Sequence, residues 1–150
     1  MILAVRVYVD TSVLISAFTH EPQQAVALGL LQAPEWDQVC VSDWTMAEFA
    51  CAIQAKVLRG ETSASLAHIL RRTLTGLVDQ GALLRLPVLR EDFSAVERTT
   101  PDQLTMVRGA DALHIAVAAR SGVSHFASLD KTQRVVARRW LLGVECLPKD

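Results

Sequence analysis

The stretch Val5–Ser12, which reads Val-Arg-Val-Tyr-Val-Asp-Thr-Ser, decides the predicted fold. Its β-branched and aromatic residues favour a strand, and the threonine and serine at its end are residues that begin helices. Asp10 therefore lies where a strand passes into a helix. In open α/β sheets this end of the strands forms the crevice in which ligands bind. A lone aspartate there is more often a turn residue or a helix cap. A functional role for Asp10 is therefore favoured only if other acids occupy equivalent places in the sequence.

Strands and helices alternate along the rest of the chain. We expect further strands over residues 38–41, 83–88, 125–129 and 144–147. Helices are expected over residues 13–18, 22–32, 44–58, 62–79, 91–98, 108–120 and 131–140, with a loop over residues 99–105. This alternation predicts an α/β fold with a central, mostly parallel sheet of four to five strands and helices on both faces. Pro87 lacks an amide donor, so its strand belongs at an edge of the sheet or ends there.

Length and composition predict one globular domain over residues 1–150. Hydrophobic residues make up 51% of the chain and charged residues 21%, which excludes a disordered chain. The apolar runs are too short to span a bilayer, and the first residues lack the pattern of a signal peptide. Cys40, Cys51 and Cys146 form no Cys-x-x-Cys pair and have apolar neighbours, so we expect buried thiols and a cytoplasmic protein. A net charge of −1 does not mark a nucleic-acid binder.

Asp130 occupies the same kind of position as Asp10. It follows the expected strand over residues 125–129 and precedes a helix. If the two strands are parallel neighbours, both carboxylates emerge at one edge of the sheet. The alternative for Asp130 is a cap of the last helix.

Glu48 and Asp111 each lie on an apolar helix, where an ionised acid needs a partner. Asp111 shares a helix face with Ile115, and no basic residue is evidently fixed beside it. Both acids also have simpler explanations. Glu48 is the fourth residue of a capping-box pattern that begins at Thr45, and Asp111 interacts favourably with a helix dipole.

Four converging carboxylates repel one another, and a divalent cation relieves that repulsion. Mg²⁺ and Mn²⁺ prefer such oxygen ligands, and ions of this kind promote hydrolysis of phosphodiester bonds. The hydroxyls of Thr11 and Ser12 can bind a carboxylate or a phosphate, but they lack the paired base of a nucleophile. The histidines show no zinc-ligand spacing, and we interpret His114 as a helix-face or core residue.

The segments Val9–Leu14, Arg108–Ala116 and Ala127–Asp130, together with Glu48, resemble in their order the motifs of PIN-domain ribonucleases. In particular, the chain resembles VapC-type toxins of type II toxin–antitoxin systems. It implies a three-layer PIN-like fold and an endoribonuclease that uses Mg²⁺ or Mn²⁺. It also implies an RNA substrate, a homodimer and a cognate VapB-type antitoxin. The implied catalytic residues are four metal-binding acids and one hydroxyl: Asp10, Glu48, Asp111, Asp130 and Ser12.

Other readings of the sequence remain open. A catalytically silent PIN-like module would bind RNA or a protein without hydrolysis. A small-molecule phosphatase of the haloacid-dehalogenase type also has an aspartate after its first strand, but it needs a second aspartate where this chain has Ser12. A nucleotide-binding enzyme would need a glycine-rich turn in place of Asp10–Val13.

Overall fold

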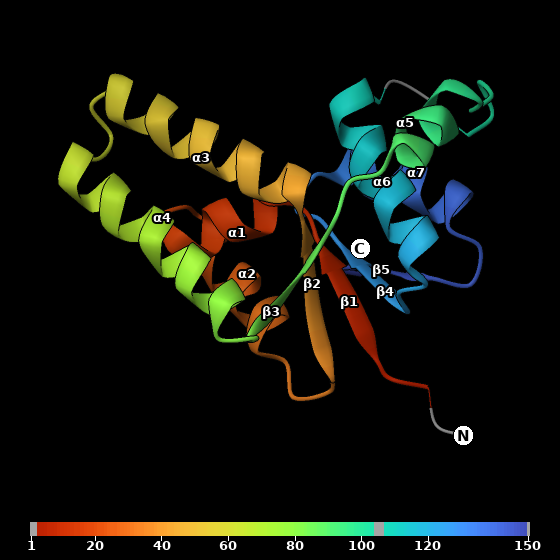
Figure 1. The fold of residues 1–150 in the computed structure, drawn as a ribbon, viewed down its shortest axis with the longest axis horizontal. Helices are drawn as coiled ribbons and strands as arrows, with labels where there is room; N and C mark the ends of the chain where they lie inside the picture. Colours follow the sequence, from red (N-terminus) through yellow and green to blue (C-terminus); the bar gives the residue numbers. More distant parts are fainter. Residues whose placement is uncertain (1–2, 104–106, 150) are drawn as a thin grey trace.

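Five strands form one sheet in the order β3-β2-β1-β4-β5, and every neighbouring pair is parallel (Figure 1). The structure is a computed structural model and describes residues 3–103 and 107–149. The strands are β1 (Arg6–Val9), β2 (Gln38–Ser42), β3 (Leu83–Leu86), β4 (His125–Ala127) and β5 (Glu145–Leu147). Because all five run in one direction, their carboxyl ends meet at a single edge. The predicted α/β fold is confirmed, and β3 lies at an edge of the sheet as Pro87 indicated.

Helices cover both faces of the sheet, which gives three layers (Figure 1). One face carries α1 (Thr11–Phe18), α2 (Gln24–Gln32), α3 (Asp43–Leu58) and α4 (Ala64–Asp79). The other face carries α5 (Arg90–Glu97), α6 (Gly109–Ser121) and α7 (Lys131–Trp140). Within the described residues, none of these helices is both long and apolar enough to cross a membrane.

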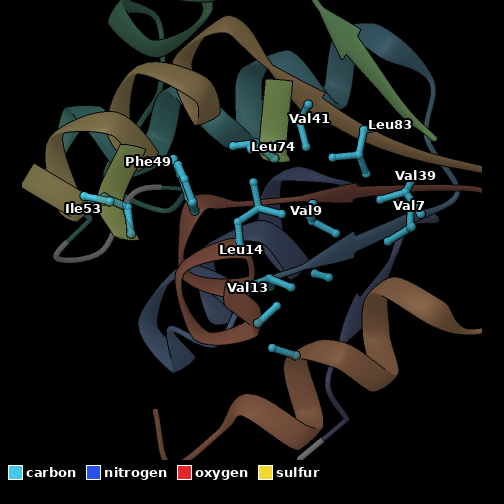
Figure 2. Packing of buried hydrophobic residues seen from close by; sticks show 14 residues of the cluster. Val7, Val9, Val13, Leu14, Val39, Val41, Phe49, Ile53, Leu74 and Leu83 are labelled. Atoms are coloured by element: carbon cyan, nitrogen blue, oxygen red, sulfur yellow. The ribbon is translucent and has the colours of Figure 1, made fainter. Parts of the chain in front are cut away.

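The alternation of side chains along β1 divides the core between the two faces. Val7 and Val9 pack in the cluster under α1–α4, which Figure 2 shows together with Leu14 and Phe49. Tyr8 points to the opposite face and packs in the second cluster, under α6 and α7. This period of two is the expected geometry of a strand that is buried on both faces.

Helix α6 is the most buried helix described. Its residues 112–118 are all buried, as predicted for a helix that is apolar on almost every side. Gly122 ends it in the left-handed conformation, with φ of 63°, which glycine adopts without strain.

Several boundaries differ from those predicted. Helix α2 begins at Gln24 rather than at Pro22, because residues 21–24 form a turn that is closed by the amide of Gln24 and the carbonyl of Glu21. β4 ends at Ala127 rather than at Leu129, and the Ser128 amide after it still donates to the carbonyl of Leu147 in β5. Residues 99–103 of the predicted loop are neither helix nor strand, and residues 104 and 105 lie outside the described residues. The expectation of three buried cysteines is wrong for Cys51, which is exposed on α3.

Candidate active site at the carboxyl ends of the strands

Asp10 is a buried acid held by neutral hydrogen-bond donors. It is the N-cap of α1, where Oδ1 accepts from Ser12 Oγ at 2.5 Å and from the Val13 amide at 3.3 Å. Its Oδ2 accepts from Ser128 Oγ at 2.6 Å, and only 3% of the residue is exposed. Burial raises the pKa of Asp10, and nearby His114 and these hydrogen bonds only partly oppose that rise. The cap interpretation is therefore confirmed, but it leaves an ionised carboxylate without full compensation.

Ser12 connects Asp10 to the turn after β4. Its hydroxyl donates to Asp10 and accepts from the amide of Leu129 at 2.9 Å. β1 and β4 are parallel neighbours, with Val9 opposite Ala127, and the Asp10 amide donates to the Ala127 carbonyl at 3.0 Å. The condition under which Asp10 and Asp130 emerge at one edge of the sheet is therefore met.

Asp130 is the N-cap of α7, which confirms the cap interpretation. Its Oδ1 accepts from the amides of Thr132 at 2.8 Å and Gln133 at 3.2 Å. Its own amide donates to Ser128 Oγ at 3.0 Å, so Asp130 shares with Asp10 a bond to the same hydroxyl. The two acids therefore lie at the same edge of the sheet.

Ser128 and Gln133 are buried polar residues that sequence reasoning missed. Gln133 Oε1 lies 3.1 Å from Ser128 Oγ, and Gln133 Nε2 donates to the carbonyl of Asp111 at 3.1 Å. The Nε2 bond fixes the first turn of α6 to Gln133, whose Oε1 lies beside the turn after β4. The one signal in the sequence was a serine at the end of an otherwise apolar strand.

Glu48 reaches the site from the second turn of α3. Its Oε1 accepts from Thr11 Oγ1 at 2.7 Å and also bonds to His114 Nε2. Burial would raise the pKa of Glu48, but these hydrogen bonds and the charges of His114 and Arg108 outweigh it and hold the pKa below its usual value. The carboxylate is therefore ionised at neutral pH.

The capping-box explanation of Glu48 is wrong. Ser42 is the N-cap of α3, and Thr45 occupies the third helical position, where the two residues bond reciprocally. The box therefore lies three residues earlier than the pattern that begins at Thr45. Glu48 is free of this role because the helix starts at Asp43.

Asp111 lies in the first turn of α6 and has a basic partner, contrary to expectation. Its Oδ2 accepts from Arg108 Nε at 3.1 Å. The Asp111 side chain is 17% exposed, whereas that of Arg108 is 82% exposed and can leave at little cost. The hydrogen bond and charge of Asp111, followed by the charges of Asp130 and Glu48, raise the pKa of Arg108. One guanidinium therefore lies within electrostatic reach of three of the four predicted acids.

His114 was interpreted as a helix-face or core residue, and its burial is confirmed at 2% exposure. Its ring nitrogens nevertheless make polar contacts, since Nδ1 bonds to Tyr8 Oη at 2.7 Å and Nε2 bonds to Glu48. The sequence offered no sign of these contacts, because Tyr8 and His114 are 106 positions apart.

The predicted acids carry the oxygen ligands that suit a divalent ion, but they are not arranged as a complete coordination shell. Within the described residues, no three His, Cys, Asp or Glu side chains form a ready metal-binding group. The observation that favours a cation is Asp10, a buried carboxylate with a raised pKa whose partners are all neutral. Carboxylate oxygens are the donors that Mg²⁺ and Mn²⁺ prefer.

Comparison with known proteins decides the family. The model of the PIN domain family matches residues 7–139 of the chain. The chain belongs to the PIN domain family. The expected three-layer architecture is thus the PIN fold, and no sequence match among curated proteins was found.

Several solved structures share this fold. VapC20 of Mycobacterium tuberculosis, a sarcin-ricin loop cleaving toxin, has a TM-score of 0.67 at 13% identity over 86% of this chain and 93% of its own. VapBC2 of Rickettsia felis, solved with a promoter DNA fragment, has a TM-score of 0.64 at 11% identity, over 97% of this chain and 100% of its own. FitAcB of Neisseria gonorrhoeae has a TM-score of 0.63 at 17% identity, over 95% of this chain and 96% of its own. At these identities the likeness establishes the fold alone.

Proposed function

We propose that this PIN domain is a Mg²⁺- or Mn²⁺-dependent endoribonuclease and the toxin of a type II toxin–antitoxin pair. The observation that carries the proposal is that hydrogen bonds link the segments that carry the four acids. The Asp10 carboxylate and the Asp130 backbone amide bond to the Ser128 hydroxyl, which lies 3.1 Å from Gln133 Oε1. Gln133 Nε2 in turn donates to the carbonyl of Asp111 in the first turn of α6. His114, also on α6, bonds to Glu48.

Asp10 and Asp111 would hold the ion, with Glu48 and Asp130 as the further acids of the site. The bound ion supplies polarisation of a phosphate oxygen, activation of water and neutralisation of the leaving oxygen. Ser12 aligns the Asp10 carboxylate through the bond that it donates. These residues would thus supply and orient the carboxylate oxygens that bind the ion.

Arg108 would bind the RNA backbone at the rim of the site. Its guanidinium is largely exposed, and among the described residues Asp111 alone bonds to it. An ion bound to Asp111 would release it, and an arginine freed in this way is suited to a phosphate group, which it can bind with two hydrogen bonds. RNA contacts of this kind supply affinity rather than sequence preference.

The partners follow from the family resemblance. VapC20, which shares the fold, is a toxin, and the resemblance to VapC-type toxins leads us to propose a VapB-type antitoxin and a homodimer for this chain. Cytoplasmic RNA is the expected substrate.

A catalytically silent module is the second candidate. The observation that favours it is that the four acids already have protein partners and that the described residues contain no ready metal-binding group. A phosphatase has less support, because Ser12 stands where that chemistry needs a second acid.

The test is cleavage of end-labelled single-stranded RNA by the purified protein in Mg²⁺, in Mn²⁺ and in EDTA. We expect metal-dependent cleavage by the wild type and none by Asp10→Asn or Asp111→Asn. Asp79→Asn, an exposed acid at the end of α4, is the matched control and should cleave normally. RNA binding without cleavage would support the silent module, and turnover of a small phosphomonoester would support the phosphatase.

A further inference from the structure

A fully buried phenol lies directly behind the candidate site. Tyr8 Oη bonds to Ser42 Oγ at 2.8 Å, to Thr45 Oγ1 at 3.3 Å and to His114 Nδ1 at 2.7 Å. Its ring stacks on Phe126 with centroids 5.7 Å apart and planes 4° apart, which holds the hydroxyl in place. The hydroxyl therefore joins the capping box of α3 to the middle of α6.

These two helices each carry a predicted acid. Ser42 and Thr45 begin α3, which presents Glu48 one turn later, while His114 lies on α6 one turn after Asp111. A hydroxyl that bonds to both helices sets the position of one relative to the other. The distance between Glu48 and Asp111 thus depends on a residue that neither acid touches.

One ring nitrogen of His114 must act as a donor. Glu48 is ionised, so its Oε1 can only accept, and His114 Nε2 must carry the hydrogen. Nδ1 accepts from Tyr8 Oη in the neutral ring with its hydrogen on Nε2, and donates to Tyr8 Oη in the protonated ring. In both forms Tyr8 binds Nδ1 and leaves Nε2 for the carboxylate.

Both donors to Glu48 reach the same oxygen. Thr11 Oγ1 and His114 Nε2 converge on Oε1, whereas Oε2 receives no hydrogen bond from the described residues. A carboxylate anchored through one oxygen presents the other one in a fixed direction. Outer partners of this kind orient metal ligands in many proteins, and their loss typically costs about 10–100-fold in metal affinity or activity.

We propose that Tyr8 and His114 are a positioning pair that holds Glu48 by Oε1 and offers Oε2 to the divalent ion or to a water bound to it. The inference rests on the proposed metal-dependent function. Both residues are buried away from solvent, so they would act on the ion through Glu48.

The experiment measures Mn²⁺ binding by calorimetry and RNA cleavage kinetics on the same proteins. His114→Leu removes the donor at similar volume, whereas His114→Gln keeps an N–H near the position of Nε2. Tyr8→Phe removes only the hydroxyl and keeps the ring packing, so it serves if His114→Leu does not fold. Ser124→Ala is the matched control, because its hydroxyl bonds to the Arg6 amide at 3.0 Å and to the Arg6 carbonyl at 2.9 Å at the opposite edge of the sheet.

We expect His114→Leu to weaken Mn²⁺ binding and to lower kcat by about 10-fold or more, with KM for RNA nearly unchanged. His114→Gln should recover most of the lost Mn²⁺ affinity and kcat. Tyr8→Phe should lower both the Mn²⁺ affinity and kcat several-fold. Ser124→Ala should lose stability without losing Mn²⁺ affinity. In the ¹⁵N spectrum of the wild-type imidazole, Nε2 should carry the hydrogen.

The outcomes separate this inference from the function. Folded His114→Leu and Tyr8→Phe proteins with wild-type Mn²⁺ affinity would overturn the positioning pair, even if the enzyme cleaves RNA. Loss of Mn²⁺ binding in these variants, in a protein that cuts no RNA, would support the pair and overturn the nuclease. A wild type that binds no Mn²⁺ at millimolar concentration overturns both.

Discussion

Replacement of the buried acid Asp10 by asparagine should stabilise the metal-free protein. The amide has the same shape, and its oxygen can accept from Ser12 and Val13 as Oδ1 does now. Its NH₂ group can donate to Ser128 Oγ, which is then free to donate to Gln133 Oε1 at 3.1 Å. All hydrogen bonds are therefore kept, and only the charge is lost.

The sign and size of the effect follow from the pKa of Asp10, which burial raises above the unfolded value. A raised carboxyl pKa contributes stability that is present below the unfolded pKa and is lost as the pH rises through the folded pKa. The amide does not titrate, so the variant gains relative to the wild type at neutral pH. Each pKa unit of elevation corresponds to about 1.4 kcal/mol, and each kcal/mol to about 2–4 °C in Tm for a chain of this length.

The assay is thermal unfolding of both proteins in EDTA between about pH 4 and pH 8. We expect the variant to melt higher at neutral pH, and the two Tm values to converge as the pH falls toward the unfolded pKa of about 3.9, where protonation of Asp10 in the unfolded chain sets in as well. Saturating Mn²⁺ should narrow or reverse the difference, since an ion at about 100 times its Kd adds about 2.7 kcal/mol to the wild type alone. A variant that is less stable than the wild type at every pH would refute the reasoning.

Three further outcomes are expected. Asp111→Asn should abolish cleavage yet change the unfolding free energy by less than about 1 kcal/mol, because its ion-pair partner is largely exposed; activity equal to the wild type would contradict its role. Millimolar Mn²⁺ should raise the Tm of the wild type, and a flat Tm would count against the metal site. Arg120→Met should lower the free energy of unfolding by about 3 kcal/mol, measured in urea, because Arg120 makes two hydrogen bonds to the buried carboxylate of Asp92. A loss below about 1 kcal/mol would show that this ion pair contributes little to stability.

The fold was predictable because local signals agree with it. The β-branched strands, the helix-starting residues after them and the proline after β3 each indicate one element, and their alternation indicates a parallel sheet. Once β1 and β4 are parallel neighbours, the sharing of one edge by Asp10 and Asp130 follows from geometry. Sequence reasoning therefore identified which acids to examine.

The partners of these acids were not predictable in the same way. Ser128 contacts Asp10 across 118 positions and His114 contacts Glu48 across 66, and such contacts exist only after the layers have packed. The capping box was misplaced because Ser42 both ends β2 and begins α3, a dual role that a local pattern does not reveal. Arg108 was overlooked as the partner of Asp111 although it is only three residues away.

The sequence contains a single tyrosine, and that residue is Tyr8. Any ultraviolet or ring-proton signal from tyrosine therefore reports on the Tyr8 side chain alone, and the protein needs no label for this. Burial, the largest cause, raises the pKa of this phenol well above its usual value, so alkaline titration should produce phenolate absorbance only when the chain unfolds. The protein thus carries its own optical probe of unfolding, in a side chain that lies beneath the candidate site.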